Sequence, residues 1–448
     1  MNAAKKRIEF SNYLINKDKN QIKEPFFNHS YKSYENFTRF TKKINFNNEF
    51  NFGKTCTVEL NQMAKYGDLI TNIIVEFTLP SIVNITTTQN QQITYTNSIG
   101  FSLYNEIDLL IGGNLIDRHS PEIMDIYSEL LTNNESRSNI DNLINKIPSQ
   151  LNGVNDINLN NKSKKIYTPL QFWFCRNLFN HQLNLPLFLL YRDEIQLRFN
   201  IKKFNELIVT PDNLDNTDFT VANQNSFNLS DTNLIIEYVI FEEEERRRLL
   251  ESSLNKTRYF MIYQVQEILF NIDTGISNVK INIELFKYLI TQLFWVFVSD
   301  TKKSKNRHLS YSIRILDQVL GVNVESNPIS KCRISYNKQD VVDEHESKYF
   351  IETEPYLNNM NNPRINSNFT KFINTFSFCI NPIKLEQPSG ICNFSSLHCP
   401  DIHLEFVDNI EQGVIKIYAI NYNVLQIKNG KGVLFHNLSK SVRDNLPE

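Results

Sequence analysis

The strongest constraint on the fold of this chain is that its second half repeats its first half. Six short segments recur in the same order in both halves. They are 69–77 with 289–297, 102–116 with 310–324, 116–119 with 342–345, 172–177 with 376–381, 195–199 with 402–406, and 235–240 with 415–420. One such match arises easily by chance. Six in one order predict two tandem copies of a single module.

The first copy is the longer of the two, because the offset between matched segments shrinks along the chain. Two polar stretches rich in Asn, 132–165 and 205–231, supply the extra residues. Surface loops accept such insertions at small cost, since the entropy of loop closure grows only logarithmically with length. We therefore expect longer loops in the first copy.

The matched segments have the pattern of β-strands. Apolar and polar residues alternate from Ile195 to Phe199 and again over 402–406, the period of a half-buried strand. The segments 73–79 and 293–298 are apolar throughout. This predicts strands that are covered on both faces.

Helices are expected in only a few places. The segment 121–131 begins with Pro and carries apolar residues at helical spacing, and 344–356 occupies the corresponding place in the second copy. A third helix is predicted over 242–254, where four Glu precede three Arg, an order that suits the helix dipole. It falls between the copies and is interpreted as their connector.

Roughly eight strands per copy predict an all-β fold with short helical excursions. The expected architecture is two tandem eight-stranded sandwiches or jelly rolls, which periodicity alone does not distinguish. The predicted division is an N-terminal arm 1–24, a first jelly roll 25–241, a helical connector 242–256 and a second jelly roll 257–448.

Composition fits two folded domains and excludes several classes of function. The chain has 448 residues, which exceeds what a single hydrophobic core usually organises, and 41% of them are hydrophobic. A net charge of -2 argues against direct nucleic-acid binding, which needs a basic surface. No apolar run is long enough to span a bilayer, and the first residues lack the apolar core of a secretory signal. We therefore expect synthesis in the cytosol.

The best candidates for a metal site are His398, His403 and Glu405, because His403 and Glu405 share one face of a strand. A further ligand at matching spacing is missing, so solvent-facing or interface residues explain them better. The chain's six cysteines lack CxxC pairs. Cys392 and Cys399 lie close enough in sequence for a redox or metal role, yet packing of reduced thiols is the simpler interpretation.

The candidates for acid–base chemistry are Asp117 with His119 and Asp343 with His345. Their occurrence in both copies instead indicates a duplicated structural feature beside the helix. Motifs for a nucleophile elbow, a P-loop or a dinucleotide fold are missing from the sequence. The sequence thus predicts no catalytic, cofactor-binding or metal-ligating residues, and a protein that is not an enzyme.

Several motifs together resemble those of the major capsid proteins of nucleocytoplasmic large DNA viruses. They span from about Phe50 to Leu434. The segments are 51–55, 67–70, 77–80, 97–100, 106–113, 167–177, 183–188, 387–390, 392–395 and 419–425. The resemblance implies two tandem jelly rolls per subunit and a homotrimer with a pseudo-hexagonal outline. It also implies that such trimers contact neighbouring trimers in an icosahedral virion capsid over an internal membrane.

The resemblance also places the basic arm 1–24 beneath the shell, toward minor capsid proteins or the internal viral membrane. A frayed tail explains its polar composition equally well. Three alternative functions remain. One is a minor capsid, penton or scaffolding protein of the same family. Another is a carbohydrate-binding sandwich, although the long loops are nearly free of Trp. The third is a β-sandwich hydrolase, for which no residue set is found.

Overall fold

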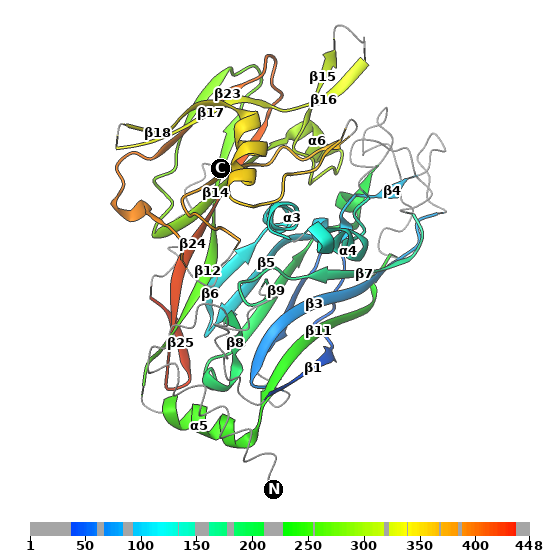
Figure 1. Ribbon diagram of the computed structural model, residues 1–448. Coiled ribbons are helices and arrows are strands. Elements are labelled where there is room, and N and C mark those ends of the chain that lie inside the picture. The colour runs from blue at the N-terminus through cyan, green and yellow to red at the C-terminus, as the bar shows by residue number, and fades with distance from the viewer. Residues whose placement is uncertain are drawn as a thin grey trace, which may run out of the picture.

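The computed structural model describes residues 37–60, 67–83, 93–132, 134–147, 161–176, 183–209, 227–253, 256–317, 322–337, 339–366, 369–383 and 388–435. The predicted arm 1–24 and much of the two insertions lie outside these ranges. Most of the described chain forms two β-sandwiches, which are stacked diagonally in Figure 1.

The first sandwich consists of two antiparallel sheets, one of five strands and one of four. One sheet has the order β1 (Phe37–Ile44), β11 (Ser230–Phe241), β3 (Leu69–Leu79) and β7 (Lys164–Pro169). The other has the order β2 (Thr55–Glu59), β9 (Ile195–Ile201), β5 (Tyr104–Ile111) and β6 (Asn114–His119). The fifth strand of the first sheet, β8 (Leu185–Pro186), is short and pairs with β3.

The second sandwich repeats this strand order and adds one strand, β25 (Lys431–Leu434), to one of its sheets. One sheet has the order β12 (Arg258–Ile272), β24 (Gly413–Lys428), β14 (Leu289–Ser299) and β21 (Asn374–Ser377). The other has the order β13 (Asn278–Asn282), β23 (Asp401–Phe406), β17 (Ile329–Tyr336) and β18 (Gln339–Glu346). The counterpart of β8 is β22 (Cys392–Asn393), which pairs with β14. The predicted double jelly roll is therefore confirmed.

Even a backbone irregularity is duplicated. β3 bulges at Thr71 against β11, and β14 bulges at Thr291 against β24. The Thr71 hydroxyl donates to the carbonyl oxygen of Glu237 at 3.3 Å, and the Thr291 hydroxyl donates to that of Ile420 at 3.1 Å. A bulge with the same hydrogen bond at equivalent positions shows that the two sandwiches are copies of one module.

Four of the six sequence matches fall on equivalent strands. A fifth, 172–177 with 376–381, joins the turn that follows β7 to the end of β21, the counterpart of β7. The sixth is wrong. The counterpart of the β5–β6 hairpin is β17–β18, whereas 310–324 runs into a different hairpin, β15 (Ile313–Asp317) and β16 (Val322–Ser326). Both hairpins consist of short strands that mix apolar and polar residues, so the local pattern alone did not separate them.

The match between 235–240 and 415–420 joins the correct strands, β11 and β24, in a shifted register. Val239 lies opposite Leu69, and Tyr422 lies opposite the equivalent Leu289. The true alignment is therefore displaced by a few residues. Both strands carry several Ile residues among other apolar residues, which makes several registers look alike.

Two of the three predicted helices are confirmed, and the third is wrong at its start. Helix α3 (Pro121–Leu130) follows β6, and α5 (Glu243–Ser253) joins the copies at the end of the molecule opposite β15 and β16 (Figure 1). The segment 344–356 begins as strand, because β18 continues to Glu346 before a π-helical turn (Tyr349–Thr353) and α7 (Glu354–Leu357). No helix within the described ranges is long and apolar enough to cross a membrane.

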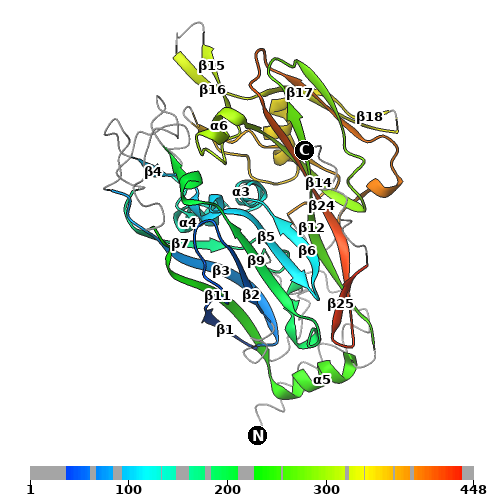
Figure 2. The same cartoon turned by 180° about the vertical axis from the view of Figure 1, so that it is seen from behind.

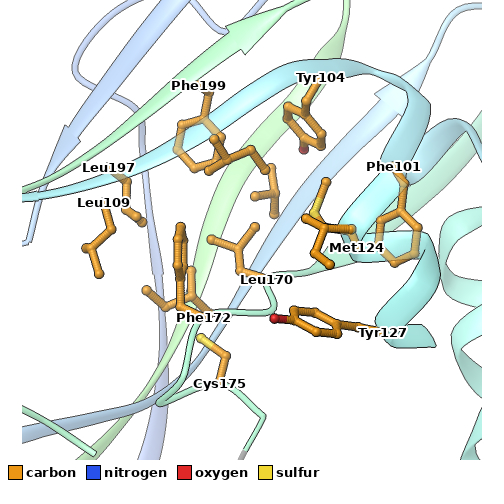
Figure 3. Packing of buried hydrophobic residues seen from close by; sticks show 14 of the residues in the cluster. Phe101, Tyr104, Leu109, Met124, Tyr127, Leu170, Phe172, Cys175, Leu197 and Phe199 are labelled. Carbon is orange, nitrogen blue, oxygen red and sulfur yellow. The ribbon is translucent and has the colours of Figure 1, made fainter. Parts of the chain in front are cut away.

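The core of the first sandwich is closed at one end by α3. Figure 3 shows Met124 and Tyr127 of this helix pointing toward Leu170 and Phe172, with Phe199 of β9 beyond them. All five side chains are buried. Burial of each large apolar side chain contributes roughly 1.5–3 kcal/mol, so α3 is an integral part of the core.

The expectation that both copies of the central strand are covered on both faces holds for β14 only. Leu293 and Trp295 enter the core of the second sandwich, while Phe294 and Val296 are buried against the first. On β3 the outer face instead carries polar residues such as Glu76 between half-buried ones. The second sandwich therefore contributes the outer face of β14 to the contact with the first, whereas the equivalent outer face of β3 takes no part in that contact.

Candidate functional site: the interface between the two sandwiches

The second sandwich lies against the first through the outer face of sheet β12-β24-β14-β21. Figures 1 and 2 show this sheet beside β6 and α3. Phe294 and Val296 of β14 and Tyr418 and Ile420 of β24 belong to the same buried apolar cluster as the first sandwich's core. The two domains therefore share one continuous apolar interior, which is typical of a permanent interface.

Helix α3 lies at the centre of this interface, and all ten of its residues are buried. The Lys416 ammonium of β24 donates to the Glu122 carboxylate at 2.6 Å, and Ser120 and Tyr418 share a hydrogen bond of 3.0 Å between their hydroxyls. Burial would raise the pKa of Glu122, but Lys416 and Lys202 outweigh it and lower the pKa to about 2. Glu122 is therefore ionised and fixes the second sandwich to the helix.

A group of buried charges is centred on Asp125 of α3. Its carboxylate accepts from Lys146 at 2.9 Å, from Lys371 at 2.7 Å and from the Tyr311 hydroxyl at 3.1 Å. Burial opposes ionisation of Asp125, but the Lys146 and Lys371 ammonium groups lower its pKa to about 2. Lys371 and Tyr311 come from the second copy, so this carboxylate joins the two sandwiches. Loss of one member of such a buried group typically costs about 3–5 kcal/mol.

An outer layer of ion pairs surrounds Asp125. Arg364 donates to both carboxylate oxygens of Asp141, at 2.5 and 3.0 Å, and its Nε lies 3.5 Å from a carboxylate oxygen of Glu129. Arg137 lies 3.2 Å from the same Glu129 oxygen and donates to the carbonyl oxygen of Asn362 at 2.9 Å. Arg364 and Asn362 belong to the second copy. The insertion of the first copy is thus tied to the second sandwich by charge-assisted hydrogen bonds.

Asp117 and His119 form a buried pair, with 3.0 Å between a carboxylate oxygen and the imidazole Nε2. The other oxygen of Asp117 accepts from the backbone amide of Val265, on β12, at 3.0 Å. The His119 ring stacks on Phe172 with 4.5 Å between centroids. This carboxylate therefore holds β6 against the second sandwich, a structural arrangement.

Asp343 and His345 lie at the equivalent place on β18 but in a different environment. Asp343 is exposed, while His345 stacks on the Tyr349 ring with 4.3 Å between centroids. A histidine packed on an aromatic ring beside the helix is the part of the feature that is duplicated. The carboxylate's contact with a second sandwich is specific to the first copy.

The structure does not bring His398, His403 and Glu405 together as ligands. Burial and the neighbouring Arg333 guanidinium, 3.3 Å from Nδ1, lower the pKa of His403. Glu405 lies 3.4 Å from Lys331, and His398 is exposed. Cations beside both strand residues disfavour a metal ion, and the described part of the chain holds no cluster of three or more His, Cys, Asp or Glu suited to one. Cys392 and Cys399 are free thiols, half-buried and exposed.

Two family models together match nearly the whole chain. The model described as the major capsid protein N-terminus matches residues 25–242, and the model of the large eukaryotic DNA virus major capsid protein matches residues 245–433. The chain belongs to the major capsid protein family of large eukaryotic DNA viruses. Its function is therefore that of a structural capsid protein, and the double jelly roll is the fold that carries it.

Relatives in this family match over most of their own length. The major capsid protein of Phaeocystis pouchetii virus is 23% identical over 514 residues, covering 91% of this chain and 94% of that protein. That of Pyramimonas orientalis virus is 25% identical over 432 residues, covering 91% and 93%. Because these relatives are major capsid proteins, the alternative of a minor capsid, penton or scaffolding role is not favoured.

Solved capsid proteins share the fold of this major capsid protein. The crystal structure of VP54 from the virus PBCV-1 superposes with a TM-score of 0.72 at 22% identity, covering 92% of this chain and 99% of that one. The Faustovirus major capsid protein superposes with a TM-score of 0.67 at 11% identity, covering 93% and 97%. Both sandwiches and their relative placement therefore follow a known capsid fold.

The residues that join the two sandwiches of this major capsid protein were not found from its sequence. The one signal in the sequence was that Asp125 and Glu129 lie among the apolar residues of a predicted helix, which indicates that they are buried. Their partner Lys371 lies 246 residues away from Asp125 and belongs to no motif. Such a pairing becomes visible only when the two copies are placed together.

Proposed function

We propose that this chain is the repeating subunit of an icosahedral virion shell. Three copies form a pseudo-hexagonal trimer, and neighbouring trimers tile the surface. The supporting observation is the rigid union of two topologically equivalent sandwiches, which gives one subunit two similar sides. A three-fold oligomer of such subunits presents six similar sides and fills a hexagonal lattice. The buried charge group around Asp125 keeps the two sandwiches at one fixed angle.

Light scattering on the purified full-length chain tests this proposal. A mass of three subunits, together with hexagonally outlined particles in electron micrographs, is the expected result. A stable monomer at high concentration, or an oligomer without threefold symmetry, would contradict the proposal. Because the interface between copies is expected to be large, the trimer should persist at micromolar concentrations.

The same proposal includes the remaining expectations from the sequence. The chain divides at 1–24, 25–241, 242–256 and 257–448. It is made in the host cytoplasm, and it acts without a catalytic residue, cofactor or metal. The basic arm 1–24 contacts minor capsid proteins or the internal membrane, whereas nucleic acid is not a partner. Deletion of 1–24 tests the arm: trimers should still form, while co-assembly with minor capsid proteins or binding to anionic vesicles should be lost.

A further inference from the structure

A cavity of about 120 Å³ lies between the two sandwiches, where β8 of the first copy faces β12 of the second (Figure 1). Leu183, Asn184 and Pro186 form the wall from the first copy, and residues 259–262 of β12 form the facing wall. A molecule in this cavity would therefore contact both sandwiches at once.

The cavity has a largely apolar lining and reaches the surface of the molecule. Trp173, Ile262 and Leu425 line it and are at most 3% exposed, whereas Tyr259, which also lines it, is 65% exposed. An apolar cavity of roughly 150 Å³ is large enough to bind benzene. The space here is only slightly smaller, so it accepts a single ring or a short alkyl chain.

One buried polar group in the lining lacks a partner. Asn184 is 7% exposed, and its side-chain oxygen Oδ1 makes no hydrogen bond within the described part of the chain. A buried amide oxygen without a donor destabilises the folded state. Because Asn184 lines the cavity, a hydrogen-bond donor placed there would satisfy this oxygen.

The backbone of β12 supplies a second polar contact. β12 is the edge strand of its sheet, and the amide of Val265 points away from β24 because it donates to Asp117. Backbone groups alternate in direction along a regularly paired strand, and the pairing of β12 with β24 has no bulge. The amides and carbonyls of Met261 and Tyr259 therefore also point away from β24, on the side where the cavity lies.

We propose that this cavity binds a compact hydroxylated molecule, either an aromatic ring or a short alkyl chain with one hydroxyl group. A hydroxyl both donates and accepts, so it donates to Asn184 Oδ1 and accepts from the Met261 amide. The apolar body packs on Trp173 and Leu425. No charged side chain lines the cavity in the described part of the chain, so an ionic ligand would be buried without a counter-ion.

This site goes beyond the proposed function and does not depend on the trimer. A ligand that binds only the folded chain stabilises it in proportion to its occupancy. Since the two walls come from different sandwiches, that stabilisation acts on the contact between them. A small molecule would thus strengthen the union on which a rigid subunit depends.

Isothermal titration calorimetry on the full-length chain tests the site with phenol and toluene, two rings of similar size of which only phenol carries a hydroxyl. Saturable binding at one site per chain is expected for phenol, with a dissociation constant of about 1 mM or tighter. Asn184→Leu keeps the size of the side chain and removes the acceptor. It should raise the ratio of the phenol to the toluene dissociation constant by about fivefold or more. An unchanged ratio would overturn the assigned hydrogen bond.

Filling the cavity gives an independent measurement. Met261→Trp enlarges a half-buried side chain of the lining and should abolish the binding of both probes. Val341→Trp, at an exposed apolar residue on β18 outside the cavity, is the matched control and should leave both dissociation constants unchanged. Circular dichroism checks that each variant is folded. Binding that survives Met261→Trp, or a lack of saturable phenol binding to the unmodified chain, would overturn the site.

The coupling to the sandwich contact is measured by thermal unfolding. Toluene at a concentration above its dissociation constant should raise the melting temperature of the unmodified chain and of Val341→Trp, but not that of Met261→Trp. A rise of equal size in all three proteins would show that toluene acts elsewhere. Because these measurements compare variants in the same oligomeric state, their failure leaves the proposed trimer standing.

Discussion

The two copies of the module share one topology, but they differ strongly in the helix that follows the equivalent strands β6 and β18. Helix α3 of the first copy is wholly buried and holds the carboxylates of Asp125 and Glu129 away from water. The corresponding α7 is shorter and exposes Tyr356 and Leu357. A contact fixed within one chain can bury charges, because their partners are always present. A surface that is free before assembly must stay compatible with water.

The outer faces of the two equivalent sheets differ in the same way. Phe294 of β14 is buried between the sandwiches, while the equivalent Ile74 of β3 lies half-buried beside lysine side chains. Covalent linkage makes the second sandwich a permanent cover for one face. The other face carries ion pairs such as Lys43–Glu76, which keep it soluble.

The largest effect is expected from Asp125→Asn, which keeps the side-chain volume and removes the charge. Lys146 and Lys371 would then be buried without their shared carboxylate, at a cost of about 3–5 kcal/mol in the free energy of unfolding. Urea denaturation measures this value. Asp343→Asn, at an exposed carboxylate, is the control and should change the free energy by about 0.5 kcal/mol or less. Equal losses of stability in the two variants would contradict the distinction between the buried α3 carboxylate and the exposed carboxylate on β18.

The comparison of sheet faces is sharpened by truncating one residue on each. Phe294→Ala should destabilise the monomer by about 3–5 kcal/mol, since it leaves a cavity between the sandwiches. Ile74→Ala should cost the monomer much less, because its side chain is only half-buried. Calorimetry of the two variants measures both effects. A monomer equally destabilised by both changes would contradict the different roles of the faces.

Acid should weaken the internal interface in a defined pH range. Asp125 and Glu122 have ordinary pKa values of 3.8 and 4.5, and both fall to about 2 in the folded chain. Lowered pKa values contribute stability that is complete above the ordinary values and is lost as the pH falls toward about 2. Each group contributes on the order of 2–3 kcal/mol. Unfolding at a series of pH values should show this loss, and Asp125→Asn should flatten the curve.

The smallest effect concerns the duplicated bulge. Thr291→Val removes the hydroxyl that donates to the carbonyl oxygen of Ile420 and should cost about 1 kcal/mol. Thr71→Val should cost slightly more, because the Thr71 hydroxyl also lies 2.9 Å from the Glu237 carboxylate. Chemical denaturation of both variants checks the order. A cost at only one site would show that the two bulges are not energetically equivalent.

Much of the fold was predictable because strands and helices leave local patterns. Alternation over 195–199, the Pro at the start of α3 and the Glu-to-Arg order of α5 each identified its element correctly. Prediction from the local sequence pattern failed where several structural arrangements share the same pattern. The β15–β16 hairpin resembled β5–β6, and the strand β18 extended through residues expected to be helical because they pair with β17.

The sequence alone determined that this protein has two copies of one sandwich, since apolar periodicity and repeated motifs record which side of each strand faces a core. Only the tertiary structure decided which copy of each surface is covered. Asp125 meets Lys371 across 246 residues, and nothing local to either residue records that meeting. A charge can be buried only where the tertiary structure places a partner of opposite charge beside it. The covered copy of each surface could therefore be told from the uncovered copy only in three dimensions.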